Sequence, residues 1–261
     1  MNSSKITSKQ QAIIQLLYKH RFLDRTHIQA LLHHKDKRRI FAWLKDLREK
    51  EYIEWIYDKN DFANKTKPAV YYLGLNGIRY LRTLNEYPST ELRKRYKESS
   101  RQQSFIGRCL TLADCCITAG TKSIGDVQYS YALEADYTKP NNEYYFLNEL
   151  KPHLCFTKQD STEHKSYLLE VFDTTTPSYM LKKRLKDYIE YLDSGEWEDA
   201  TGDSQPPIVL MACTTTADLL YAKHRTRTLL EDAGNDNLHI RFATLERLRQ
   251  HGVTGIIWEE T

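Results

Sequence analysis

The stretch KDKRRIFAWLKDL, residues 35–47, decides the fold of the first part of the chain. Four of its first five residues are cations, and regularly spaced apolar residues follow. The apolar positions recur at the i, i+3, i+4, i+7 spacing of a buried helix face: Ile40, Trp43, Leu44 and Leu47. Asp36 precedes this stripe and can cap the first turn. The stretch therefore predicts an amphipathic helix with a basic N-terminal end.

The other face of this predicted helix has the composition of a DNA-reading surface. At about 100° per residue, the positions that point away from the apolar stripe are Arg38, Ala42, Lys45 and Glu49, flanked by Arg39 and Phe41. Arginine pairs with the edge of guanine, while small or aromatic side chains contact the thymine methyl group. A recognition helix meets base edges through its N-terminal half. We predict that this helix reads DNA; the alternative is an ordinary solvated basic face.

The flanking sequence predicts two helices before this one and a hairpin after it. The helices are SKQQAIIQLLYKH (8–20), capped by Ser8, and DRTHIQALLHH (24–34), capped by Asp24. The runs YIEWIYD (52–58) and KPAVYYLGL (67–75) flank the turn-rich loop KNDFANKT (59–66), so they predict a β-hairpin with a basic tip. A last helix, LNGIRYLRTL (75–84), is expected to pack through Leu75, Ile78, Leu81 and Leu84.

Three helices followed by a basic-tipped hairpin are typical of a winged helix-turn-helix domain, which we expect to span residues 1–88. The tip would lie over phosphates or a minor groove. The residues predicted to contact DNA are Lys35, Lys37, Arg38, Arg39, Phe41, Ala42 and Lys45 on the third helix and Lys59, Lys65 and Lys67 on the hairpin.

Residues 89–120 predict a connector helix. Its first part is basic, and its second part, from Phe105 to Cys116, is apolar. Winged-helix proteins bind two half-sites as dimers, so this segment is our candidate for a homodimer interface. The apolar stripe fits ordinary packing within one chain equally well.

The net charge of +3 hides two oppositely charged halves. Residues 1–110 contain 23 Lys and Arg and 11 Asp and Glu, a net of +12; residues 111–261 contain the other 15 and 24, a net of −9. The positive charge of the first half favours binding to a polyanion, and the negative charge of the second half favours contact with a protein. The alternative is that the two halves attract each other.

Other features exclude several classes of protein. No run has the roughly 18 apolar residues of a membrane span, and the N-terminus has no apolar signal core, so we expect a cytoplasmic protein without membrane contact. The five cysteines form no C-x-x-C pair, which favours buried reduced thiols over disulfides or zinc. No glycine-rich phosphate loop, G-x-S-x-G or H-E-x-x-H motif occurs.

The second half predicts an α/β domain over residues 121–261. Strands are expected in GDVQYSYALEADYT (125–138), ELKPHLCFTK (149–158), SYLLEVFDTT (166–175), PPIVLMACTT (206–215), NLHIRFATLERL (237–248) and GIIWEE (255–260). Helices are expected in SYMLKKRLKDYIEYLDSG (178–195) and in ADLLYAKHRTRTLLEDAG (217–234), the second ended by Gly234. With the first domain, the fold class is α+β.

Three short motifs lie along this order of elements: Lys151-Pro152-His153, Leu169-Glu170-Val171-Phe172-Asp173-Thr174 and Arg184-Leu185-Lys186-Asp187-Tyr188. With the winged N-terminus, they resemble the replication-relaxation family of plasmids and other mobile elements, whose second domain is similar to restriction endonucleases. The resemblance implies Pro-Asp on one strand, Glu-x-Asp at the end of the next, and a Lys or Arg with a Tyr along the following helix.

The chain departs from the pattern of an active nuclease. That site needs two acidic groups for a divalent cation and a neighbouring Lys. His153 stands in place of the first Asp, Phe172 in place of the Lys, and Asp173 follows one residue late. The remaining candidates are Glu170 and, on the helix, Lys182 or Lys183. We interpret Glu170 and Asp173 as buried remnants paired with Lys or Arg from the next helix, in a domain that is not an enzyme.

The sequence therefore predicts a sequence-preferring double-stranded DNA-binding protein of a mobile element, without a cofactor. It would act as a replication or relaxation accessory factor or as a transcriptional regulator. The acidic domain would contact a second copy or a protein such as a replication initiator or relaxase. The alternative is a Mg²⁺-dependent endonuclease or nickase that uses Glu170 and Asp173, with His153 and Lys183 as further candidates at the degenerate site.

Overall fold

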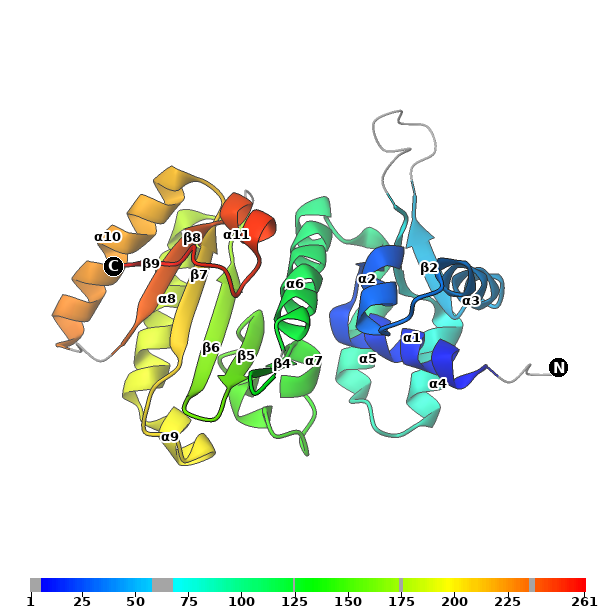
Figure 1. The fold of residues 1–261 in the computed structure, drawn as a ribbon, viewed down its shortest axis with the longest axis horizontal. Helices are drawn as coiled ribbons and strands as arrows, with labels where there is room; N and C mark the ends of the chain where they lie inside the picture. Colours follow the sequence, from blue (N-terminus) through cyan, green and yellow to red (C-terminus); the bar gives the residue numbers. More distant parts are fainter. Residues whose placement is uncertain (1–5, 58–67, 124, 174–175, 235–237) are drawn as a thin grey trace. The chain divides into compact units, whose positions relative to one another are not determined.

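The structure is a computed structural model that describes residues 6–57, 68–123, 125–173, 176–234 and 238–261. The chain forms two compact units, residues 1–113 and 114–261 (Figure 1). The α+β fold class is confirmed, because the first unit is a winged helix-turn-helix and the second is an α/β sandwich around one sheet.

The first unit contains the predicted helices and hairpin. Its elements are α1 (Ser8–His20), β1 (Leu23–Asp24), α2 (Arg25–Leu31), α3 (Lys37–Glu49), β2 (Ile53–Ile56), β3 (Val70–Leu73) and α4 (Leu75–Thr83). The strands form an antiparallel sheet of order β1-β3-β2, in which β2 and β3 are the predicted hairpin. The short strand β1 was not predicted, because two residues are too few for a period-2 pattern.

Side-chain caps set the start of all three helices of the helix-turn-helix. Asp24 caps α2 and Asp36 caps α3, as predicted. The cap of α1 is Thr7 and not Ser8, because the Thr7 hydroxyl accepts the Gln10 N–H while the Gln10 side chain bonds back to the Thr7 N–H. This reciprocal pair satisfies two backbone donors, whereas Ser8 already lies inside the helix.

The predicted apolar stripes form the core of this unit. Ile13, Leu17, Ile28, Ile40 and Leu47 are all fully buried. The prediction for α4 was right for Ile78 and Leu81 but wrong for Leu75, which is 41% exposed at the first position of the helix. The α4 helix lies so close to the turn after α3 that a Cβ at Gly77 would overlap the Tyr52 carbonyl oxygen.

The predicted connector is not one helix. It consists of α5 (Ser89–Arg95), the 3-10 turn η1 (Glu98–Ser100) and α6 (Gln103–Thr121). The helix breaks where Glu98 is buried, 2.9 Å from Arg21 and 3.7 Å from Arg95. Burying a carboxylate requires such partners, and they fix this segment onto the C-terminal end of α1.

The apolar side chains of α6 are buried within the single chain. Phe22 packs with Ile106 and Cys109, and Leu112, Ala113 and Cys116 are also covered. These contacts fit the packing alternative, and the homodimer itself stays a prediction that they do not test.

The second unit has a six-stranded mixed sheet of order β4-β5-β6-β7-β8-β9 (Figure 1). The strands are β4 (Gln128–Ala132), β5 (Leu154–Gln159), β6 (His164–Val171), β7 (Ile208–Cys213), β8 (Ile240–Thr244) and β9 (Glu259–Glu260). The neighbouring pairs β6–β7 and β7–β8 are parallel, and the other neighbouring pairs are antiparallel. The helical elements are α7 (Glu134–Tyr137), η2 (Tyr145–Asn148), α8 (Ser178–Asp193), α9 (Glu196–Thr201), α10 (Thr216–Ala233) and α11 (Leu245–His251).

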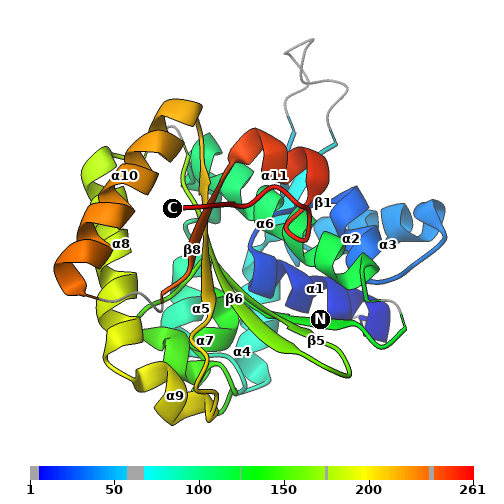
Figure 2. The same ribbon diagram turned by 60° about the vertical axis from the view of Figure 1, so that its left-hand side comes forward.

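Helices α8 and α10 lie on one face of the sheet and α11 on the other (Figures 1 and 2). Gly234 ends α10 in the left-handed conformation, as predicted. The predicted strand 237–248 is wrong in its second half, because Thr244 caps a new helix, α11, at that point. Within the described residues, none of the helices is long and apolar enough to cross a bilayer. All five cysteines are buried and reduced, as predicted.

Candidate functional site

The predicted recognition surface on α3 is open to solvent. The residues Lys35, Lys37, Arg38, Arg39, Ala42 and Lys45 are exposed, and Phe41 is 52% exposed. Two of the cations have an acidic neighbour: Arg39 lies 3.7 Å from Asp36 and Lys45 lies 3.8 Å from Glu49. Such solvated pairs stabilise little and exchange readily for a phosphate. The predicted hairpin residues Lys59, Lys65 and Lys67 lie outside the described residues.

Contacts at the two ends of α3 fix the direction of this surface. The Asp36 carboxylate accepts the N–H groups of Arg38 and Arg39 at 2.8 and 3.3 Å. Near the other end, Asp46 accepts hydrogen bonds from Gln10 of α1 and from Lys50. The cation Lys50 is thus held by the fold, whereas Arg38 has no ion pair among the described residues. Cations held by a carboxylate, such as Lys50, are thus distinguished from cations without an ion pair, such as Arg38.

The residues predicted for a nuclease-like site surround one buried carboxylate, Glu170. Along β6, alternate residues Leu168, Glu170 and Phe172 face α8, where Leu168 and Phe172 belong to the core. Glu170 is 2% exposed within this apolar layer. Burial without partners would be costly for its charge, so the neighbouring elements supply donors.

Three donors from α8 converge on a single oxygen of this carboxylate. The Arg184 Nε and Nη2 atoms donate to Glu170 Oε1 at 2.8 and 2.6 Å, and the Tyr188 hydroxyl donates to the same oxygen at 2.7 Å. Arg184 Nη2 also donates to the Lys151 carbonyl at 2.9 Å. Arg184 and Tyr188 are one helical turn apart, so both reach the sheet from the same face of α8.

The other carboxylate oxygen faces the histidine that replaces the expected Asp. His153 Nδ1 lies 3.0 Å from Glu170 Oε2 and also 3.0 Å from the Val171 nitrogen. A neutral ring with Nδ1 unprotonated accepts the Val171 N–H, whereas a charged ring donates to Glu170. In either state, His153 is placed against the carboxylate and fixes the loop before β5.

These contacts decide the charge state of Glu170. Burial raises the pKa of its carboxyl, but His153 and Arg184 outweigh burial and lower this pKa to about 2. For Arg184, burial acts to lower the pKa, and the charge of Glu170 more than compensates, so its pKa is raised. Burial, followed by the adjacent carboxylate, raises the pKa of Tyr188. At neutral pH the group is therefore a carboxylate, a guanidinium and a neutral phenol.

Two further predicted residues have different surroundings. Asp173 follows the end of β6. Thr176 donates its N–H to the Asp173 carbonyl and its hydroxyl to the Asp173 carboxylate. Lys183 is exposed on α8, so Arg184 occupies the helix position that faces Glu170. The predicted pairing of Glu170 with a cation of the next helix is thus confirmed, and its interpretation as a nuclease remnant stays a prediction. That cation lies one residue after Lys183, because only Arg184 shares the inward face with Tyr188.

The residues around Glu170 do not fit a divalent cation. Such an ion prefers several oxygen ligands, and here Glu170 Oε1 already accepts three hydrogen bonds while a histidine and a guanidinium flank it. Within the part of the chain that the structure describes, no cluster of three or more His, Cys, Asp or Glu side chains could hold a metal ion.

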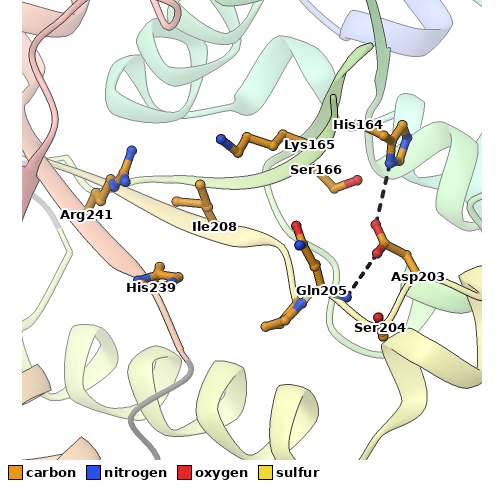
Figure 3. Close-up of a pocket in the computed structure, with 10 residues that line it drawn as sticks. His164, Lys165, Ser166, Asp203, Ser204, Gln205, Ile208, His239 and Arg241 are labelled. Atoms are coloured by element: carbon orange, nitrogen blue, oxygen red, sulfur yellow. Dashed lines mark hydrogen bonds and ion pairs between the residues drawn. The ribbon is translucent and has the colours of Figure 1, made fainter. Parts of the chain in front are cut away.

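A separate pocket lies at the opposite, N-terminal end of the parallel strands (Figure 3). It has a volume of about 480 Å³ and is lined by residues such as His164, Lys165, Asp203 and Arg241. His164 lies 3.5 Å from Asp203, Lys165 pairs with Glu163, and Arg241 lies 2.9 Å from Glu260. These three basic side chains of the lining each have an acidic neighbour.

The sequence as a whole now identifies the family. The model of the replication-relaxation family matches residues 14–205, which include the helix-turn-helix, Glu170 and α8. The chain belongs to the replication-relaxation family. A comparison with curated proteins gives no match.

Several solved structures show low similarity to this chain. The zinc-responsive MarR family member ZitR of Lactococcus lactis is 18% identical over 38% of this chain and 75% of that chain, with a TM-score of 0.25. In another ZitR structure the match spans 60% of that chain. The adhesin competence repressor AdcR of Streptococcus pyogenes is 18% identical over 38% of this chain and 80% of its own, with a TM-score of 0.24. Restriction endonuclease FokI bound to DNA is 12% identical over 97% of this chain and 46% of its own, with a TM-score of 0.31.

Proposed function

We propose that this chain is a sequence-preferring double-stranded DNA-binding protein of a plasmid or other mobile element. It acts in the cytoplasm as an accessory factor in replication or relaxation, or as a transcriptional regulator of the same DNA. The observation that carries the proposal is the outward face of α3, where Arg38, Phe41 and Ala42 are exposed next to one another in the N-terminal half of the helix.

The C-terminal unit serves as a scaffold and not as a nuclease in this proposal. Support comes from the hydrogen bonds at Glu170, whose oxygens face Arg184, Tyr188 and His153. A second support is the net charge of the unit: residues 114–261 include 15 cationic and 24 acidic residues, a net of −9. A domain that holds DNA for cleavage is expected to concentrate positive charge around its site.

The acidic unit is also the proposed contact for protein partners. A second copy of the chain, a replication initiator or a relaxase are the candidates. Because the apolar side chains of α6 are buried within one chain, a homodimer would use a different surface. Polar, acidic surfaces of this kind set partner choice and association rate more than affinity.

The first experiment measures DNA binding by α3 variants. A duplex library is bound to the full chain, selected sequences are recovered, and their Kd values are measured by fluorescence anisotropy. Arg38→Ala with Lys45→Ala should weaken binding of the selected site by about tenfold or more, because a base contact and a phosphate contact are lost. The control is Lys50→Ala, whose side chain is already held by Asp46 and should matter little. Equal affinity of the double variant and the wild type would remove α3 as the reader.

The second experiment tests whether the C-terminal unit cleaves DNA. Supercoiled plasmid is incubated with the purified chain and Mg²⁺ or Mn²⁺, and nicked and linear products are measured. The proposal expects no cleavage above the level of a Glu170→Ala preparation. Cleavage by the wild type that is lost in Glu170→Ala would establish the endonuclease alternative instead.

A further inference from the structure

The outer face of α8 carries a stripe that the degenerate site does not use. Tyr179, Lys182, Lys183 and Lys186 follow the i, i+3, i+4, i+7 spacing, so they share one face of the helix. All four are exposed, and Tyr179 is 70% exposed. The opposite face is buried through Leu181, Leu185 and Tyr188. We call the four exposed residues the α8 stripe.

The lysines of the α8 stripe differ from several other cations of this acidic unit. Carboxylates hold Lys158 (by Asp160), Lys223 and Arg247 (by Glu259) and Arg241 (by Glu260). Among the described residues, Lys182, Lys183 and Lys186 form no ion pair. A unit with 24 acidic residues and 15 cations thus leaves three neighbouring cations without a counter-charge.

This arrangement works against the stability of the helix. Lys182 and Lys186 are one turn apart, as are Lys183 and Lys186, and like charges at these spacings destabilise a helix by roughly 0.2–0.5 kcal/mol per pair. The helix also has no acidic residue in its first turn and no basic residue in its last turn, so it lacks the terminal charges that its dipole favours. A solvated face selected for stability alone would alternate its charges.

We propose that the α8 stripe binds the phosphate backbone of nucleic acid, as a second contact of the DNA that α3 reads. Three lysines at helical spacing are complementary to successive phosphates, and the exposed Tyr179 ring adds a hydroxyl donor or a stacking surface. The inference rests on the proposed function, since DNA held by the first unit raises the local phosphate concentration at the second.

The net charge of the unit does not oppose this contact at close range. At physiological salt, charges more than about 8 Å apart are largely screened, so a phosphate at the stripe responds mainly to the three lysines. Two acidic residues lie near the stripe on α8: Asp187, which is 4.0 Å from Arg184, and the exposed Glu190, one turn after Lys186. Neither forms an ion pair with a lysine of the stripe among the described residues. Polyanionic DNA is favoured over an acidic protein because the other unit, with 23 cations and 11 acids, already suits it.

The experiment measures the salt dependence of DNA affinity for the full chain. The test variant is the triple substitution Lys182→Gln, Lys183→Gln and Lys186→Gln. The charge-matched control is Lys122→Gln, Lys139→Gln and Arg249→Gln in the same unit, and a second control replaces the three stripe lysines by Arg. Kd is measured by anisotropy on one duplex between low and moderate salt.

Three lost phosphate contacts should reduce the slope of log K against log salt by roughly 2.7 and weaken binding about tenfold or more at moderate salt. The Arg variant and the charge-matched control should keep the slope of the wild type. In addition, a photoreactive residue at position 179 should crosslink to labelled duplex. Because the three stripe lysines are exposed, the thermal unfolding of the test variant and of the Arg variant should coincide with that of the wild type.

The outcomes separate this inference from the proposed function. If the wild type binds DNA, but the test variant matches both controls and position 179 does not crosslink, the inference is wrong and the proposed function stands. The inference is also wrong, and the proposed function stands, if the stripe lysines bind anionic vesicles or an acidic peptide while the triple substitution leaves the salt dependence of DNA affinity unchanged. If the wild type does not bind any duplex, the proposed function itself fails.

Discussion

The outward face of α3 and the Glu170 group of the C-terminal unit use charged residues in opposite ways. On α3, Arg38 and its neighbours are exposed and lack strong partners. Around Glu170, the carboxylate is buried and accepts hydrogen bonds from Arg184 and Tyr188 at 2.6 to 2.8 Å. The residue types made the face of α3 a candidate for contact with DNA and the Glu170 group a candidate for metal-dependent cleavage.

The difference shows that the partners of a charged side chain, more than its type, determine what it can still bind. A solvated cation loses little when it exchanges water for a phosphate, whereas a buried ion pair must be broken before either member can bind a ligand. Variants of the two regions should therefore separate cleanly into effects on DNA affinity and effects on stability.

The largest expected effect comes from breaking the buried pair. Arg184→Ala leaves the Glu170 carboxylate buried without its main counter-charge, which should lower the free energy of unfolding by about 3–5 kcal/mol. The adjacent exposed Lys183→Ala is the control and should change stability little. Urea denaturation followed by circular dichroism measures both. Similar unfolding midpoints for the two variants would mean that the group around Glu170 does not hold the unit together.

A smaller effect is expected from the pH dependence of the same group. The pKa of Glu170 is lowered from 4.5 to about 2, so its ionised form stabilises the fold fully above about pH 4.5, and this contribution is lost as the pH falls towards 2. The size of the loss is on the order of 2–3 kcal/mol. Glu170→Gln lacks this titration, so the stability difference between wild type and variant should shrink over that window. A constant difference from pH 6 to pH 2.5 would contradict the lowered pKa.

The first unit was predictable because its signals are local. Asp24 and Asp36 directly precede apolar stripes, so the cap and the period agree on where α2 and α3 begin. The errors have equally local causes. Thr7 and Ser8 are both capping residues, and only the partner Gln10 distinguishes them. The break after α5 depends on Glu98 meeting Arg21, a contact between residues far apart in the sequence, which no local pattern reveals.

The Glu170 group was predictable in part. The alternation of residues in β6 places Glu170 on one face of the sheet. The spacing of Arg184 and Tyr188 places both on one face of α8. Only the packing of α8 on the sheet brings the two faces together. Lys183 was chosen as the cation because its residue type fits a nuclease, yet its position is about 100° from that of Arg184 around the helix. The helical spacing from Tyr188 was the signal that could have identified Arg184.

The smallest effect on DNA affinity is expected at Asp36, the exposed cap of α3. Hydrogen bonds from the Arg38 and Arg39 backbone N–H groups lower the pKa of the Asp36 carboxyl, so this acid is ionised beside the cations that we expect to meet phosphate. Asn caps a helix as well as Asp does, so Asp36→Asn should leave the melting temperature unchanged while DNA affinity rises about twofold to threefold at low salt. Asp36→Ala should instead lower the melting temperature, because the cap is lost. Anisotropy titrations at two salt concentrations measure the gain, which should fade at the higher one; weaker binding by Asp36→Asn would place the N-terminal end of α3 away from the DNA backbone.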